Sequence, residues 1–537
     1  MEIFKSFNRL RGMRSQKEKP WTFVKRIIFN DETILDLDQG SIVIFVGPNN
    51  CGKSQVLKEI EAPIENRAIV IKSIEFTCKG DLEEESFFKQ YFILSGEDGC
   101  YSPELNLSMR KSELFDTWKE GTPDYNIFKA FTNRLSIEKR SLVFSGVYST
   151  GTGVQTSDLN LKFHNNNKIA QKISGCYEKI FGVQLASGRS KGNNKFDIYC
   201  GNLPCLKDFT MDNQDDYYKQ LENFPLVEEQ GDGMKSVANI LIDTFITDSL
   251  ITLIDEPEAF LHPPQSRLLG NLLARELDSE SQLFISTHSA SFIRGIIESN
   301  NRNVIIVNMF RNQDKTSISI LDEKILATLK DDPIIRYSNV LEGIFYTGII
   351  ICESDYDSLF YSSVVNDIAD EQDKLGPDIL FTHCGGKPRI KMMFKTLRKM
   401  AIKPVIICDF DFLFKKDDFE SIISEIVEDN IDQIKGDLEA YLEYIKNAPL
   451  DAIKKQGKYA LPDNILPVYR RIECFLNNNG IFPVPYGEME SFYTGTDKSK
   501  RFWVYEILEK FDLAKAPELQ NARDFLNKIV EYVYQKG

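Results

Sequence analysis

The chain has 537 residues, of which 42% are hydrophobic and 27% charged, the composition of a globular protein that is too long for a single core. Its net charge of -15 excludes a surface coated throughout with nucleic acid but is compatible with a local basic groove. No apolar run approaches the roughly 18 residues that span a bilayer, and the ten cysteines form no Cys-x-x-Cys pair. We therefore expect two or three domains of a cytoplasmic protein with reduced cysteines and no membrane partner.

The N-terminal part begins with a basic tail, residues 1–20, that has few core-forming residues. The apolar run Ile42–Val46 then predicts a buried strand that leads directly into a complete Walker A motif, Gly47–Ser54. In such a loop, backbone N–H groups surround the phosphates, Lys53 reaches the β and γ oxygens, and the Ser54 hydroxyl coordinates Mg²⁺. We expect ATP to be bound by Gly47, Asn49, Asn50, Cys51, Gly52, Lys53, Ser54 and Gln55.

Residues 75–225 are the least informative part of the sequence. Short aromatic runs typical of strands alternate with polar stretches that contain Asn and Gly, and no repeat or heptad pattern is visible. We expect this region to complete the ATPase lobe and to add an insertion or dimerisation region, in preference to forming a separate catalytic domain.

Three later motifs are typical of ATPases of the ABC type. The stretch Gln230–Ser236, which precedes an apolar helix from Val237, has the position of the signature loop that caps the γ-phosphate bound by a partner subunit, although it departs from the usual Ser-Gly-Gly-Gln. A later strand ends in a Walker B pair, in which Asp255 would hold Mg²⁺ through water and Glu256 would polarise the attacking water. His288 follows another strand, at the place of the switch histidine that senses the γ-phosphate.

The second half of the chain places acids directly after apolar runs. Glu353 follows one such run, Asp357 lies one helical turn later, and Asp409 and Asp411 follow another run. Carboxyl ends of parallel strands meet at one edge of a sheet, where carboxylates repel one another unless a divalent cation lies between them. The pattern predicts a magnesium site. The order of strands, acids and helices resembles a Toprim domain, the metal-binding catalytic fold of topoisomerases, primases and some nucleases.

A basic helix is expected between these strands. Residues 387–403 contain seven lysines and arginines and no acid, and Lys391, Lys395 and Arg398 recur at helical spacing on one face. A solvated basic face and a contact with a phosphate backbone beside the metal site are both compatible with this pattern.

The succession of motifs in one chain resembles the OLD (overcoming lysogenization defect) family of ATP-dependent nucleases. The resemblance rests on Gly-Pro-Asn-Asn-x-Gly-Lys-Ser, Asp-Glu-Pro-Glu-x-x-Leu-His-Pro and Ser-Thr-His-Ser, followed by the Toprim pattern, and covers residues 43–493 apart from 75–225. It implies an ABC-type ATPase that assembles homodimers or larger oligomers, joined to a Toprim domain that cuts DNA with Mg²⁺ or Mn²⁺. Several members of the family act in defence against phages, some beside a partner such as a retron reverse transcriptase with its RNA and DNA or a helicase-like protein.

The resemblance also implies roles for individual residues. Glu353 and Asp357 match the first acidic motif of the family. Asp409 and Asp411 match its Asp-x-Asp motif, and Glu490 closes a later Gly-acid-x-Glu motif. The metal ligands expected in the two halves are Ser54, Asp255, Glu353, Asp357, Asp409, Asp411 and Glu490. The expected catalytic residues are Glu256, His288, Glu353, Asp409, Asp411 and a late lysine that is either Lys498 or Lys500.

We expect an α/β protein in which an ABC-type P-loop ATPase head, residues 21–335, precedes a Toprim domain, residues 336–537, with a helical embellishment at 412–480. The expected function is an ATP-hydrolysing, nucleotide-regulated, metal-dependent DNA endonuclease in anti-phage defence. The alternative is a repair-type ABC ATPase that clamps DNA or a partner protein without cutting. A membrane transporter ATPase is a third and poorer interpretation, because it leaves the C-terminal acids unexplained. The sequence does not decide the DNA substrate, the trigger, the stoichiometry, or whether ATP activates or restrains cutting.

Overall fold

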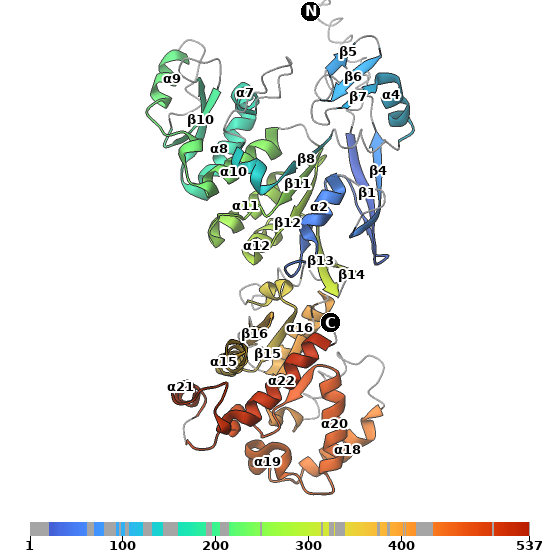
Figure 1. Ribbon diagram of the computed structural model, residues 1–537, viewed down its shortest axis with the longest axis vertical. Coiled ribbons are helices and arrows are strands. Elements are labelled where there is room, and N and C mark those ends of the chain that lie inside the picture. Colours follow the sequence, from blue (N-terminus) through green and yellow to red (C-terminus); the bar gives the residue numbers. More distant parts are fainter. Residues whose placement is uncertain are drawn as a thin grey trace, which may run out of the picture. The chain divides into compact units, whose positions relative to one another are not determined.

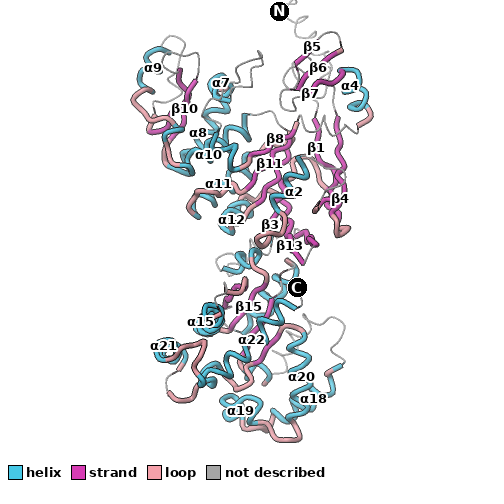
Figure 2. Tube along the Cα trace, in the orientation of Figure 1, coloured by secondary structure: helices cyan, strands magenta, loops and turns pink. Residues whose placement is uncertain are grey.

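The computed structural model divides into two compact units, Met1–Ile320 and Leu321–Gly537 (Figures 1 and 2). The structure describes residues 21–61, 69–79, 93–95, 98–102, 107–121, 131–142, 159–189, 196–203, 214–246, 250–312, 315–321, 327, 339–372, 376–383, 387–400, 402, 404–414, 433–496 and 499–535. The basic tail expected at 1–20 and the boundary expected at 335/336 lie outside these residues.

A six-stranded sheet forms the centre of the first unit. Its strands are β3 (Ile42–Val46), β8 (Thr132–Leu135), β11 (Ile251–Asp255), β12 (Gln282–Ser286), β13 (Val304–Asn312) and β14 (Lys315–Leu321). They lie in the order β14-β13-β3-β12-β11-β8, and the pairs from β13 to β8 are parallel. Asp255 pairs with Ser286, and Ser286 pairs with Phe45. The strands that carry the Walker A, Walker B and histidine motifs therefore end at the same edge.

A second, antiparallel sheet shares a core with the first. Its strands are β1 (Trp21–Phe29), β2 (Ile34–Asp36) and β4 (Ile71–Lys79), in the order β2-β1-β4. Helix α2 (Lys53–Glu61) begins inside the Walker A motif, and its Val56 and Leu57 are fully buried in one apolar cluster with Phe29 and Phe45. The helix is thereby fixed between the two sheets, as Figure 1 shows.

The region 75–225 adds strands and helices to the head. Apart from β8, it contains β5 (Ile93–Ser95), β6 (Gly99–Ser102), β7 (Leu107–Arg110), α4 (Lys111–Lys119), α6 (Ile137–Leu142), α7 (Leu159–Asn165), α8 (Asn167–Phe181), β9 (Gln184–Arg189), β10 (Phe196–Gly201) and α9 (Gln214–Leu221). Strands β5 to β7 form one antiparallel sheet and β9 pairs with β10. Because β8 is an edge strand of the central sheet, this region contributes to the same fold as the nucleotide motifs.

Three further helices of the head lie between residues 232 and 298. They are α10 (Asp232–Ile246), preceded by the short 3-10 helix η4 (Val227–Glu229), α11 (Pro263–Glu276) and α12 (Ala290–Glu298). Helix α10 begins five residues before the apolar run expected from Val237. Asp232 in the first turn, paired with Lys235 at 3.2 Å, favours this earlier start because an acid stabilises the positive end of the helix dipole.

The second unit is built on a four-stranded parallel sheet. Its strands are β15 (Gly348–Cys352), β16 (Ile379–His383), β17 (Pro404–Cys408) and β18 (Ile481–Pro483), in the order β16-β15-β17-β18. The helices are α15 (Asp355–Glu371), α16 (Lys387–Lys399), α18 (Lys435–Ile445), α19 (Leu450–Gln456), α20 (Leu466–Asn478), α21 (Lys500–Lys510) and α22 (Gln520–Gln535), with 3-10 turns η5 (Asn339–Phe345), η6 (Phe410–Leu413), η8 (Gly457–Ala460), η9 (Met489–Phe492) and η10 (Pro517–Leu519). Alternation of strands and helices places acids after β15 and β17 at one edge.

The core of the second unit joins the sheet to its C-terminal helices. Trp503 of α21 is fully buried against Phe360 of α15, with their rings 5.0 Å apart, and both belong to one cluster with Leu526 of α22. The embellishment expected at 412–480 contains α18, α19, η8 and α20, while its residues 415–432 lie outside the described part. Among the described residues, no helix has both the length and the apolar character needed to cross a membrane.

Candidate functional site

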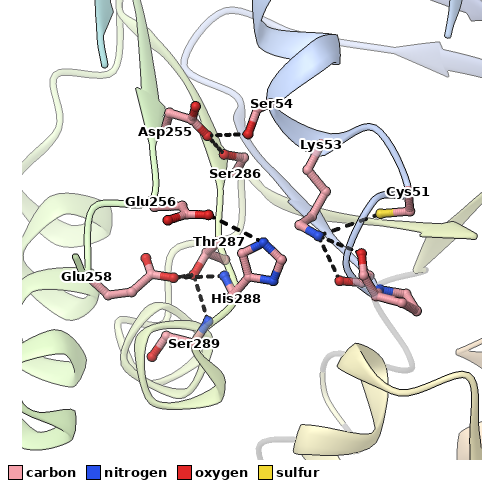
Figure 3. Close-up of polar contacts among 12 residues, drawn as sticks. Cys51, Lys53, Ser54, Asp255, Glu256, Glu258, Ser286, Thr287, His288 and Ser289 are labelled. Carbon is pink, nitrogen blue, oxygen red and sulfur yellow. Dashed lines mark hydrogen bonds and ion pairs between the residues drawn. The ribbon is translucent and has the colours of Figure 1, made fainter. Parts of the chain in front are cut away.

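The Walker A loop connects β3 to α2 (Figure 3). Gly47 and Gly52 have φ values of 141° and 101°, which residues with a Cβ rarely adopt, and a Cβ on Gly47 would lie 2.1 Å from the carbonyl oxygen of Met309. Asn50 also has a positive φ, 63°. Such reversals just before a helix N-terminus make an anion-binding backbone nest, so the loop fits the phosphates of ATP.

Lys53 is buried inside this loop, with 4% of its surface exposed. Its Nζ donates to the carbonyl oxygens of Gly47 (2.9 Å) and Pro48 (2.8 Å) and lies 3.6 Å from Cys51 Sγ. Burial lowers the pKa of Lys53, while Cys51 and the Walker B acids favour its charged form. The ammonium group is therefore held by uncharged acceptors of the loop, for which a phosphate oxygen can substitute.

The remaining predicted ATP-binding side chains differ in their surroundings. Asn49 and Asn50 are exposed at the tip of the loop, whereas Cys51 is buried and burial raises the pKa of its thiol. The Gln55 amide donates to Glu59 Oε1 at 3.0 Å, along α2, so it supports the helix that follows the loop.

The two predicted Mg²⁺ ligands of the head meet although they are far apart in the sequence. Ser54 Oγ donates to Asp255 Oδ1 over 2.8 Å, and the Ser286 hydroxyl donates to the same oxygen. Hydroxyl and carboxylate oxygens are the donors that Mg²⁺ prefers. This pair therefore fits a magnesium ion that bridges to nucleotide phosphates.

The predicted catalytic glutamate faces the predicted switch histidine. Glu256 Oε1 lies 3.4 Å from His288 Nε2. Burial and the nearby Lys53 lower the pKa of His288 to about 4, so the imidazole is neutral near pH 7 and this contact is not an ion pair. Glu256 itself has φ of 48°, a left-handed backbone conformation that costs free energy in a residue with a side chain.

Glu258 connects the Walker B turn to the histidine loop. Its Oε1 accepts hydrogen bonds from Thr287 Oγ1 and from the backbone N–H of His288, both at 2.7 Å. Thr287 Oγ1 in turn accepts the N–H of Ser289. Burial raises the pKa of Glu258. These bonds fix the backbone on which His288 is carried.

Arg140, on α6, contacts the backbone of the Walker B turn. The side chain is 1% exposed, and its Nη2 donates to the carbonyl oxygens of Asp255 (2.7 Å) and Glu256 (3.0 Å). Its Nε and Nη1 are buried with no hydrogen-bond partner among the described residues. Burial lowers the pKa of Arg140 to about 10, although Glu258 and the Walker B acids oppose the shift. The charged guanidinium of Arg140 is thus buried against the backbone carbonyls of Asp255 and Glu256. These hydrogen bonds act on the segment in which Glu256 has its left-handed conformation.

The stretch expected as the signature loop forms the first turn of α10. Gly233 lies against the backbone that follows the Walker B turn, since a Cβ there would be 2.5 Å from the carbonyl oxygen of Phe260. Met234 accepts a hydrogen bond from Tyr177 through its carbonyl, at 3.4 Å. The role of Gln230–Ser236 toward a partner's nucleotide stays a prediction.

In the second unit, three predicted acids converge at the carboxyl edge of the parallel sheet. One ligand oxygen from each of Glu353, Asp409 and Asp411 lies within 4.8 Å of the others, the one such group found among the described residues. Glu353 Oε1 also accepts the backbone N–H of Asp409 at 3.1 Å. Burial and the neighbouring Glu353 and Asp357 raise the pKa of Asp409 well above its ordinary value. A divalent cation would relieve this repulsion, and three carboxylates fit one.

Asp357 and Glu490 lie beside this cluster and have other partners. Asp357 Oδ2 accepts hydrogen bonds from the N–H and hydroxyl of Ser354, both at 2.9 Å, which makes a capping box for α15. Glu490 Oε1 accepts the backbone N–H of Lys500 at 2.7 Å. Both acids are predicted metal ligands, and each accepts a hydrogen bond from a backbone N–H near the cluster.

Lys500 is the cation among these acids. Although burial lowers the pKa of Lys500, the carboxylates of Asp357, Asp409, Glu490 and Glu353 together raise it above its ordinary value. Lys500 begins α21 with φ of 35°, an unusual conformation that the Glu490 contact stabilises. Lys498, the other lysine left open by the sequence, lies outside the described residues.

A second lysine reaches the acids from the helical embellishment. Lys454 Nζ, on α19, lies 3.7 Å from Asp411 Oδ2. The approach depends on Gly487, whose φ is 113° and whose Cβ would lie 2.2 Å from the Lys454 carbonyl oxygen. Lys454 belongs to no sequence motif described above.

The basic segment predicted between the strands forms helix α16. Arg398 is exposed on it and its guanidinium lies 5.9 Å from the ring of Phe394. The side chains of Lys391 and Lys395 lie outside the described part, so the expected basic face stays a prediction.

Comparisons with known proteins bear on the first unit. Residues 95–294 match the family model described as "AAA domain, putative AbiEii toxin, Type IV TA system". The chain contains an AAA-type ATPase domain. The Walker B pair and His288 lie within the matched residues, and the Walker A motif precedes them. No curated protein matches the chain.

Several solved structures of SMC heads resemble the chain. The SMC head bound to the C-terminal winged-helix domain of ScpA is 14% identical and aligns over 57% of this chain and 99% of its own, with a TM-score of 0.35. An SMC head with an extended coiled coil from Pyrococcus furiosus, bound to the C-terminal domain of ScpA, is 11% identical over 58% and 99%, with a TM-score of 0.34. The SMC head domain from Thermotoga maritima is 11% identical over 57% and 98%, with a TM-score of 0.31.

The ATPase site contains residues that motif recognition alone passed over. Ser286 and Thr287 lie in the quoted histidine motif, and Glu258 lies in the quoted Walker B motif, but their hydrogen bonds depend on the strand register. Arg140 belongs to no recognised motif. It closely follows β8, which reads Thr-Asn-Arg-Leu and has no apolar run, so the sequence gives no signal for the pairing of β8 with the Walker B strand.

Proposed function

We propose that this protein is an ATP-regulated, divalent-metal-dependent DNA endonuclease of the OLD type, in which the second unit is a Toprim nuclease domain. The observation that carries the proposal is the convergence of Glu353, Asp409 and Asp411 at the carboxyl edge of a parallel sheet, with Lys500 beside them. Such a cluster is costly without a cation, since burial and like charge both disfavour ionised Asp409.

The nuclease step follows from the charges around the cluster. A bound Mg²⁺ or Mn²⁺ would supply Lewis-acid stabilisation of the scissile phosphate and an activated water. Glu353, Asp409 and Asp411 would hold the ion, with Asp357 and Glu490 completing the acid set. Lys500 is a cation in the same group, and it would stabilise the charge that develops on the phosphate oxygens.

The head would act as a nucleotide switch. ATP bound between two heads of a homodimer or larger oligomer would contact the Walker motifs of one subunit and Gln230–Ser236 of the other. Glu256 would orient the attacking water, and the neutral His288 would contact the γ-phosphate. Because Glu258 joins the Walker B turn to the histidine loop, a change at the γ-phosphate would move both elements together.

The biological setting that fits this combination is anti-phage defence. The proposal rests on the resemblance to the OLD family, some of whose members work beside a reverse transcriptase with its RNA and DNA or beside a helicase-like protein. A partner of this kind would supply the trigger for cutting.

The test is incubation of the purified protein with supercoiled plasmid and Mg²⁺ or Mn²⁺, with and without ATP. We expect nicked or linear products that require the metal and whose amount changes with ATP. ATP hydrolysis and DNA binding without any cut under these conditions would favour a repair-type ATPase that clamps DNA.

A further inference from the structure

One exposed surface of the second unit combines aromatic rings with a cation. Helix α21 buries Trp503, Val504 and Ile507 on its inner side. On its outer side Phe502 is 64% exposed and Tyr505 is 45% exposed. Phe502 and Tyr505 lie three residues apart on one face of the helix, and exposed aromatic side chains gathered on one surface indicate a binding site.

The rings are organised around one guanidinium group. Arg501 Cζ lies 5.9 Å from the ring centroid of Phe502 and 5.8 Å from that of Tyr505. Tyr356, in the first turn of α15, meets Tyr505 edge to face, with 6.5 Å between ring centroids. We call Tyr356, Arg501, Phe502 and Tyr505 the aromatic platform.

The platform has a rigid base. Trp503, between its residues in the sequence, packs on Phe360 at 5.0 Å and donates its Nε1–H to the Tyr493 carbonyl oxygen at 2.9 Å. Helices α15 and α21 also pack directly on each other, as Figure 1 shows. The backbone that carries the platform is therefore anchored to the core, which lowers the entropy cost of binding a ligand there.

The platform adjoins the acid cluster through both of its helices. Arg501 follows Lys500, whose backbone N–H donates to Glu490 Oε1 at 2.7 Å. On the other helix, Tyr356 precedes Asp357 directly. A strand whose phosphate lies at the acids would thus pass its neighbouring nucleotides over the platform.

We propose that the aromatic platform binds unpaired bases of the DNA strand that is cut, so that the nuclease acts on single-stranded or locally melted DNA. This inference rests on the proposed function and specifies its substrate. Aromatic rings stack on any base but cannot reach the faces of bases that are paired and stacked within a duplex. The Arg501 guanidinium can stack on bases as well and donate to phosphate.

Binding is tested without metal, so that no cleavage takes place. In EDTA, fluorescence anisotropy measures the affinity of the full-length protein for a fluorescent single-stranded DNA of about 15 nucleotides and for its duplex. The test variant, Phe502→Leu with Tyr505→Leu, keeps apolar bulk and removes the rings. Tyr505→Phe keeps the ring, and Leu450→Ala removes an exposed apolar side chain of the same unit on α19.

We expect the double leucine variant to bind the single strand at least about tenfold more weakly, as loss of base stacking predicts. Affinity for the duplex should change by less than about threefold, and both control variants should bind like the wild type. Unchanged binding of the single strand, or equal weakening for the duplex, would overturn the platform. An RNA of the same sequence bound about tenfold more tightly than the DNA would overturn DNA as its occupant.

A change in oligomeric state of the double leucine variant in size-exclusion chromatography with light scattering would instead assign the platform to a contact between copies, and overturn the inference. The outcome is separable from the proposed function. If the protein cuts DNA with metal but loss of the rings does not weaken binding, only the base-binding role of the platform is overturned. If loss of the rings weakens binding but no metal supports cutting, only the nuclease proposal is overturned.

Discussion

Replacing Arg140 with methionine tests whether the Walker B backbone is held by a side chain outside the known motifs. Methionine keeps the apolar part of the buried side chain and removes the Nη2 group that donates to the carbonyl oxygens of Asp255 and Glu256. A hydrogen bond from a charged donor contributes about 1.5–3 kcal/mol. The change also removes the desolvation cost that lowers the pKa of Arg140 to about 10, so we expect a net loss of roughly 2 kcal/mol in the free energy of unfolding.

The catalytic effect should exceed what this loss of stability alone would cause. Glu256 has φ of 48°, and without the guanidinium it can relax toward an ordinary conformation that moves its carboxylate away from His288. Displacing a general base by about 1 Å costs on the order of 100-fold in rate. We therefore expect kcat for ATP to fall roughly 10- to 100-fold with KM changed little, because the Walker A loop is untouched.

The assay is steady-state ATP hydrolysis alongside urea denaturation, with Arg134→Met as the matched control. Arg134 lies on strand β8, just before α6 in the sequence, but contacts Glu61 of α2, at 2.7 Å, rather than the Walker B turn. The control should lose some stability and keep its kcat. Arg140→Lys, which retains one cationic donor, should recover part of the rate. An Arg140→Met protein that matches the control in both stability and kcat would refute the positioning role.

Further predictions concern the two predicted sites and the basic helix. Lys53→Ala should weaken ATP binding in a filter or fluorescence assay, whereas Glu256→Gln should bind ATP, hydrolyse it poorly and hold the heads together; unchanged ATP turnover in both would contradict the assignment. His288→Gln should make the stability of the protein less sensitive to acid. The pKa of His288 is about 4 in the folded protein against 6.5 for an ordinary histidine, so the wild type loses stability as the pH falls below 6.5. At pH 5 this loss is at most about 2 kcal/mol, and solvent screening makes it smaller. Denaturation curves that shift equally with pH in both proteins would show that this histidine is not responsible. Replacing three basic residues of α16, Lys391, Lys395 and Arg398, with glutamate should weaken DNA binding. The slope of log affinity against log salt concentration should become shallower by roughly one unit per lost phosphate contact. An unchanged slope would favour a solvated basic face.

The motifs of the head could be predicted from sequence because each depends on a short local pattern. Glycines at Gly47 and Gly52 and the apolar strand before them predict a phosphate loop, and the loop is present with the positive φ values that it requires. The prediction of an ATPase domain is confirmed by the family match, which describes an AAA domain. The OLD and Toprim assignments stay predictions.

What the sequence could not supply was tertiary placement. Arg140 reaches the Walker B turn only because β8 pairs in parallel with β11, and no local pattern specifies that pairing across more than 100 residues. Lys454 approaches Asp411 because Gly487 allows two backbones to come close. Likewise Asp357 matches a metal-binding motif, but in the structure the Ser354 hydroxyl donates a hydrogen bond to it.

The measurement that tests the central claim most directly compares wild type with Asp409→Ala in two assays on the same preparation. Asp409 belongs to the acid cluster, while the Walker residues that are predicted to bind and hydrolyse ATP belong to the other unit. We predict that metal-dependent DNA cutting is lost in the variant and that ATP hydrolysis stays close to the wild-type rate. Undiminished cutting by Asp409→Ala, or a covalent protein–DNA complex trapped with the wild type, would contradict a hydrolytic metal site formed by Glu353, Asp409 and Asp411.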